Sequence, residues 1–141
     1  MSVVVTPDLL SHNTGRTLRV LIVEDNVDGA DSMAMLLKLY GYDVRVTYDG
    51  CAAVKDVQAD SPDVVLLDIG LPDIDGYEVC RRLRASLKQK KPFFIAVTGR
   101  GEDRDLKLSQ EAGIDLHLVK PIHENSLEAM LKTFQRLLTD K

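Results

Sequence analysis

The chain has 141 residues, of which 45% are hydrophobic and 28% are charged, and its formal net charge is −4 at pH 7. This length suits one domain, and the composition excludes a disordered protein and a fold that needs a disulfide or a metal to form. No apolar run approaches the roughly 18 residues of a membrane helix, and the negative charge argues against a nucleic-acid surface.

Residues 1–17 carry Pro7, Gly15 and polar side chains without a sustained period. This pattern predicts a flexible extension or linker before a domain that spans 18–141. The basic start and the apolar centre of a secretory signal are both absent, so we expect no export and a cytoplasmic location.

From residue 18 onward, apolar strand candidates alternate with helical candidates of about 10 to 15 residues. The strand candidates are 18–23, 43–47, 63–67, 93–97 and 115–119. This alternation predicts an α/β fold, with a doubly wound five-stranded parallel sheet and helices on both faces.

The helical candidates differ in how much apolar surface they offer to the sheet. Small and apolar residues follow the helical spacing in the first candidate, at Ala30, Met33, Ala34 and Leu37. The last candidate carries a full apolar stripe within 127–138, so both helices should dock firmly. The helix near 102–112 buries little apolar surface and should move at a small cost in free energy. Gly41 and Gly113 are expected to end helices in the left-handed conformation.

Polar side chains stand at the carboxyl ends of four predicted strands. Glu24 and Asp25 follow the first strand, Asp68 follows the third, and Thr98 and Lys120 follow the last two. The carboxyl ends of parallel strands meet at one edge of the sheet, where open α/β sheets bind their ligands. We therefore expect these five side chains to share one crevice.

Three carboxylates in one pocket would repel one another, which predicts a bound cation. Hard oxygen ligands favour Mg²⁺, held by Glu24, Asp25, Asp68 and the backbone carbonyl of Gly70. No organic cofactor is expected.

A hydroxyl and an amine complete the predicted site. Thr98 and Lys120 would face an anion beside the metal, and such a set is typical of phosphoryl chemistry. Asp68 ends the most apolar strand, so we predict that it is the nucleophile and forms an aspartyl phosphate. The predicted catalytic residues are thus Asp68, Thr98 and Lys120.

From residue 18 to about 138 the chain resembles a response-regulator receiver domain, the phosphoacceptor module of two-component signalling. The motifs that carry the resemblance are Val23-Glu24-Asp25-Asn26, Leu67-Asp68 with Leu71-Pro72 and Asp75-Gly76, Val97-Thr98-Gly99, and Val119-Lys120-Pro121. The resemblance implies an acid pair at Glu24 and Asp25, a phosphoacceptor at Asp68, a switch hydroxyl at Thr98 and a phosphate-binding lysine at Lys120. It also implies the strand order 2-1-3-4-5 and a cis bond before Pro121.

The segment His117-Leu118-Val119-Lys120-Pro121 is most similar to receivers attached to hybrid sensor histidine kinases. The resemblance implies a phosphorelay in which a sensor histidine kinase or a phosphotransfer protein supplies a phosphohistidine. The phosphoryl group would pass to Asp68 with Mg²⁺ and switch the binding of a protein partner. The expected partner face is formed by the helix near 102–112, the strand 115–119 and the last helix. Such a module is not a conventional enzyme, although it promotes its own phosphorylation and dephosphorylation, and we expect no direct contact with nucleic acid or membrane.

One position departs from the family pattern. His117 stands where receivers usually have Tyr or Phe, three residues before the lysine. Because imidazole gains a proton near neutral pH, we predict a switch that depends on pH between about 6 and 7. The alternative is that His117 is an exposed edge residue. Arg100, two positions past Thr98, is an exposed residue or, by resemblance, a modulator of phosphoryl lifetime together with Gly70.

Two other functions compete with this one. A receiver-like interaction module would bind its partner independently of phosphorylation. A flavodoxin-like binder would share the topology, but the acids after the first strand would repel the phosphate of FMN, and no phosphate-binding loop follows that strand. Cys51 and Cys80 lack the spacing of a zinc site, and we interpret them as reduced, packed thiols.

Overall fold

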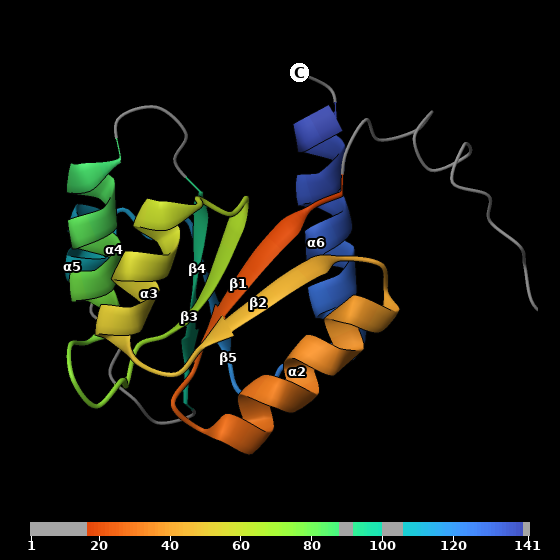
Figure 1. Cartoon of the computed structure of the whole chain (residues 1–141), viewed down its shortest axis with the longest axis horizontal. Coiled ribbons are helices and arrows are strands. Elements are labelled where there is room, and N and C mark those ends of the chain that lie inside the picture. The colour runs from red at the N-terminus through yellow and green to blue at the C-terminus, as the bar shows by residue number, and fades with distance from the viewer. Residues whose placement is uncertain (1–16, 88–91, 100–105, 140–141) are drawn as a thin grey trace, which may run out of the picture. The chain divides into compact units, whose positions relative to one another are not determined.

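Five parallel strands form one sheet in the order β2-β1-β3-β4-β5 (Figure 1). A computed structural model describes residues 17–87, 92–99 and 106–139. The strands are β1 (Arg19–Val23), β2 (Asp43–Thr47), β3 (Val64–Asp68), β4 (Phe93–Thr98) and β5 (Leu116–Val119). Both the predicted fold class and the predicted strand order are confirmed, and every strand boundary lies within one residue of its predicted position.

The chain divides into two units. The larger, Arg19–Pro121, holds the sheet and four of the described helices: α2 (Val27–Leu39), α3 (Gly50–Ala59), α4 (Gly76–Ser86) and α5 (Leu106–Ala112). Within this unit α2 covers one face of the sheet, and α3, α4 and α5 cover the opposite face (Figure 1). The smaller unit contains α6 (Glu124–Thr139), in which Leu127, Leu131 and Phe134 are buried.

Apolar side chains from the sheet and from α3, α4 and α5 form a continuous core. β3 is buried at all of its residues, as expected for a strand covered on both faces. Leu67 of β3 and Phe94 of β4 lie in this core with Val79 and Leu83 of α4. The core therefore fixes the end of β3, which is the position of Asp68.

Local backbone features agree with the sequence. Gly41 and Gly113 have φ of +94° and +91°, which confirms the predicted left-handed helix ends. The Lys120–Pro121 peptide bond is cis, as the resemblance implied. None of the helices in the described residues is long and apolar enough to cross a membrane. The predicted extension 1–17 lies, apart from Thr17, outside the described residues and stays a prediction.

The two cysteines are free but differ in environment. Cys80 is buried, its thiol lies 3.0 Å from the carbonyl oxygen of Ala112, and burial raises its pKa to about 12. Cys51 is exposed at the start of α3, so the prediction of two packed thiols was wrong for this residue. A residue in the first turn of a helix points outward when it lies off the apolar face, and Ala53 and Val57 form that face in α3.

Candidate functional site

Three carboxylates meet at the carboxyl ends of β1 and β3. Glu24, Asp25 and Asp68 each place one oxygen within 4.8 Å of the others. Glu24 and Asp25 follow β1 directly, whereas Asp68 is the last residue of β3. These three predicted residues are therefore brought together, and we call this group of carboxylates the acidic pocket below.

Lys120 supplies the positive charge of this pocket. Its Nζ lies 2.7 Å from Oε1 of Glu24 and 3.5 Å from Oδ2 of Asp68. Burial disfavours the ammonium ion, but the hydrogen bond with Glu24 and the charge of Asp68 outweigh burial, so the pKa of Lys120 is raised. Lys120 thus carries its charge throughout the neutral pH range.

The turn after β1 explains why Asp25 remains available. Asn26 is the N-cap of α2, because its Oδ1 accepts a hydrogen bond from the N–H of Gly29 at 2.9 Å. The N–H of Asn26 in turn donates to Oε2 of Glu24 at 3.2 Å. Since Asn26 performs the capping, the exposed carboxylate of Asp25 is left for a ligand.

The loop after β3 holds Asp68 in place. The N–H of Gly70 donates to Oδ1 of Asp68 at 2.9 Å, and the N–H of Gly76 donates to the carbonyl of Ile69 at 3.1 Å. A Cβ at Gly76 would lie 2.9 Å from the carbonyl oxygen of Asp68, closer than real Cβ contacts allow. Glycine at position 76 is therefore required for the start of α4 to approach the loop.

Asp73 anchors the same loop to α3, a role that the sequence did not suggest. Its carboxylate accepts hydrogen bonds from the N–H groups of Gly50 and Cys51, each at 2.9 Å. These bonds to the first turn of α3 hold the pKa of Asp73 well below its usual range. The loop that begins at Asp68 is thereby tied to a second helix.

We expect Asp73→Asn to change the pH dependence of stability. A carboxyl whose pKa is lower in the folded state stabilises the fold above its unfolded pKa of about 3.9 and loses that effect as the pH falls. The variant should cost about 1 kcal/mol or less at pH 7, since the group is exposed, and steadily less as the pH falls below about 4 toward the lowered pKa of the folded carboxyl. Urea unfolding between these pH values measures the difference, with Asp28→Asn as an exposed control. A difference that stays constant with pH would contradict the role of the ionised carboxylate.

Thr98 is the last residue of β4, and His117 lies within β5. Thr98 is only 1% exposed, and its hydroxyl donates to the carbonyl of Leu118 at 3.4 Å. His117 is half-buried, with Nε2 2.8 Å from Oγ of Ser109 on α5. This bond joins β5 to α5, and Ser109 is a partner that the sequence analysis missed. Arg100 lies outside the described residues.

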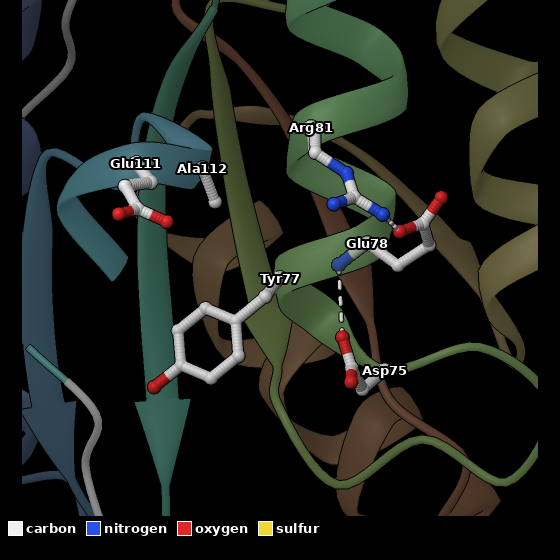
Figure 2. A pocket seen from close by; sticks show the side chains of 6 residues that line it. All are labelled: Asp75, Tyr77, Glu78, Arg81, Glu111 and Ala112. Carbon is white, nitrogen blue, oxygen red and sulfur yellow. Dashed lines mark hydrogen bonds and ion pairs between the residues drawn. The ribbon is translucent and has the colours of Figure 1, made fainter. Parts of the chain in front are cut away.

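A separate pocket lies between α4 and α5 and contains none of the predicted site residues. Asp75, Tyr77, Glu78, Arg81, Glu111 and Ala112 line it (Figure 2). Asp75 caps α4 by accepting the N–H of Glu78 at 2.8 Å, and Arg81 pairs with the Glu78 carboxylate. The charged groups of this pocket are thus largely paired within α4, and the acidic pocket remains the candidate site.

Comparison with known proteins agrees with the geometry. Residues 20–132 match the sequence model of the response regulator receiver domain. The chain belongs to this family. Its predicted phosphoacceptor function in two-component signalling follows from that membership.

Several solved receivers are similar in structure. A CheY-like receiver from Methylobacillus flagellatus is 32% identical, with a TM-score of 0.77 over 84% of this chain and 99% of that one. The BeF3-activated N-terminal receiver of RstA from Klebsiella pneumoniae is also 32% identical, with a TM-score of 0.72 over 84% and 98%. The receiver of a sensor histidine kinase from Pseudomonas aeruginosa PAO1 has a magnesium ion in its active site cleft. It is 29% identical, with a TM-score of 0.75 over 85% of this chain and 98% of that one.

Mg²⁺ fits the acidic pocket of this receiver. Receiver domains bind Mg²⁺ among acids of this kind, and this chain brings three carboxylates close together with one compensating ammonium group. Hard oxygen ligands on a partly open surface suit an ion that keeps several of its waters. Gly70 lies exposed two residues beyond Asp68, and its carbonyl as a further ligand stays a prediction.

Proposed function

We propose that Asp68 is the residue of this receiver that accepts the phosphoryl group, from a phosphohistidine on a sensor histidine kinase or a phosphotransfer protein. The observation that carries the proposal is the contact of Asp68 with Lys120 inside the acidic pocket. Asp68 is 8% exposed, so its carboxylate is held by the protein yet open to a donor. Attachment to a hybrid kinase is consistent with the sequence and stays a prediction.

The transfer exchanges one bond to phosphorus for another. An oxygen of Asp68 bonds to phosphorus as the bond from phosphorus to the donor imidazole nitrogen breaks, and that nitrogen keeps the electron pair. The N–H of Gly70 holds one oxygen of Asp68, and Lys120 stabilises the charge on the transferred group. Mg²⁺, held by Glu24, Asp25, Asp68 and the Gly70 carbonyl, would supply further positive charge when bound. Water later hydrolyses the acyl phosphate and restores the free carboxylate.

The added phosphoryl group carries about two negative charges near pH 7, which attract the hydroxyl of Thr98. Turning to the phosphate, this hydroxyl would release the carbonyl of Leu118 on β5. We assign the switched partner surface to β5 and α5, where Leu116 and Val119 of β5 are 43% and 41% exposed. The sequence analysis also expected the last helix in this surface, and that part stays a prediction.

Intact mass spectrometry tests the proposed function. The wild-type chain is incubated with acetyl phosphate in Mg²⁺ and, separately, with a chelator. We expect a gain of one phosphoryl group that requires the ion. Absence of any gain, together with absence of Mg²⁺ binding in calorimetry, would favour an interaction module that acts independently of phosphorylation.

His117 gives the switch a predicted pH dependence. Its bond to Ser109 joins the two elements that we assign to the partner surface, and protonation changes which ring nitrogens can accept a hydrogen bond. We expect the phosphorylation-induced change in amide exchange of β5 and α5 to vary between about pH 6 and 7. His117→Tyr should flatten this profile, whereas His123→Tyr, outside both elements, should not. A wild-type profile as flat as that of His117→Tyr would refute the prediction.

Three expectations remain predictions. The first is the cytoplasmic location. The absence of direct contact with nucleic acid is expected from the net charge of −4, and the absence of contact with membrane is expected from the lack of a long apolar run. The assignment of 18–141 to one receiver domain awaits a test by limited proteolysis.

A further inference from the structure

The outer face of α2 exposes large apolar side chains. Met35 is 66% exposed and Leu39 is 78% exposed, although Ala30, Ala34 and Leu37 of the same helix are buried. Beside Met35 lies a groove of about 440 Å³ between α2 and the edge strand β2, lined by Asp31, Ala34, Met35, Lys38, Val44, Val46 and Tyr48. We call it the α2–β2 groove. Exposed apolar surface of this kind marks interaction sites.

Opposite charges stand at the two ends of the groove. Asp31 and Lys38 are both exposed and lie two helical turns apart along α2, so they flank Met35 on one face. Tyr48 donates its hydroxyl hydrogen to Oδ1 of Asp31 at 2.7 Å, which fixes the carboxylate at the rim. Lys38 forms no ion pair within the described part of the chain. The groove is therefore acidic toward the start of α2 and basic toward its end.

This distribution is complementary to itself when a second α2 runs antiparallel. Suppose that the two-fold axis passes between positions 34 and 35. A residue on one side of the axis then faces the partner residue that lies equally far on the other side, so each Asp31 faces Lys38 of the partner. In that same register Met35 faces the small Ala34 of the partner, which lies on the groove floor and leaves room for the longer side chain. Two ion pairs and two apolar insertions are thus satisfied at once by a single symmetric contact.

We propose that the α2–β2 groove binds a second copy of this chain, in an antiparallel α2–α2 contact with Met35 seated on Ala34 of the partner. The inference is independent of the proposed function, because it uses neither the acidic pocket nor the β5–α5 surface. β2 and β5 are opposite edges of the sheet, so the contact leaves the switch surface open. A contact through one helix is smaller than a standard interface of about 1,600 Å², so the dimer is weak and depends on concentration.

Sedimentation velocity across about 10 µM to 1 mM tests the contact, with calorimetric unfolding to verify that each variant is folded. Asp31→Lys and Lys38→Asp each place like charges opposite one another at both ends, and each alone should weaken association about tenfold. An equimolar mixture of the two variants should associate as well as the wild type. In a mixed dimer one chain carries both positive charges and the other carries both negative charges, so both ion pairs re-form. Only a two-fold contact through these residues gives this recovery.

Two further variants separate the apolar and local contributions. Met35→Glu should weaken association in every combination, since it buries a charge against Ala34. Tyr48→Phe removes the hydrogen bond to Asp31 but no charge, and it should leave the dissociation constant within about twofold of the wild type. A wild-type chain that is monomeric throughout, or a mixture that fails to recover, would overturn the proposal. If the wild type is monomeric and Met35→Glu lowers the stability of the fold, the groove is instead covered by residues of the same chain.

Discussion

Asp68→Asn is expected to abolish phosphoryl uptake, with a fall in rate of about 10³-fold or more. The amide nitrogen is a poor nucleophile because its lone pair is delocalised, and no acyl phosphate can form. Asparagine keeps the shape of the side chain, and its oxygen can still accept the N–H bond of Gly70 that the structure shows at 2.9 Å. The loss would therefore report the missing carboxylate rather than a displaced loop.

Asp60→Asn is the matched control for this experiment. Asp60 is also a carboxylate that forms ion pairs, with Arg19 and Arg45, but it follows α3 at the opposite end of the strands. The Asp60→Asn chain should be phosphorylated at the wild-type rate, as measured by intact mass and by peptide mapping. A phosphoryl group that appears on the Asp68→Asn chain at an undiminished rate would assign the acceptor to another residue.

Lys120→Met is expected to change metal affinity and phosphorylation in opposite directions. The ammonium group lies within 3.5 Å of two carboxylates and competes with a cation for them. Its removal should strengthen Mg²⁺ binding about tenfold, a value reduced for the partial exposure of the lysine. Phosphorylation should nevertheless slow by about 10²-fold, because the charge that stabilises the transferred group is absent.

Isothermal titration with Mg²⁺ and the rate of uptake from acetyl phosphate measure the two effects. Lys55→Met, an exposed change on α3, should alter neither. A variant that loses both metal affinity and phosphorylation would indicate that Lys120 has a structural role, because a positive charge cannot favour a bound cation nearby.

The sequence predicted those parts of the site that depend on strand order alone. Asp68 and Thr98 end strands and Lys120 directly follows one, and a parallel sheet brings such ends together whatever the details of packing. The apolar run of β3 was a clear signal of a strand because β3 is buried at every position. The acidic pocket could therefore be placed before any side chain was positioned.

Contacts between distant loops could not be predicted in this way. Asp73 binds the N–H groups of Gly50 and Cys51, more than 20 positions earlier, and any polar loop residue would give the same sequence signal. Ser109 meets His117 only because α5 lies against β5 at a particular height. Gly76 belonged to a matched motif, but its reason, the close approach to the Asp68 carbonyl, required coordinates. Registers between helices and loops are set by packing, which a one-dimensional pattern does not encode.

The contrast between the two thiols makes the native chain suitable for site-selective labelling. Maleimide reacts with thiolates, and Cys80 is both inaccessible and held protonated by its pKa of about 12. Cys51 is the one other cysteine of the sequence, and it is exposed next to the carboxylate that anchors the Asp68 loop. An environment-sensitive fluorophore attached there would report the loop's response to phosphorylation in real time, in a protein that requires no engineered cysteine.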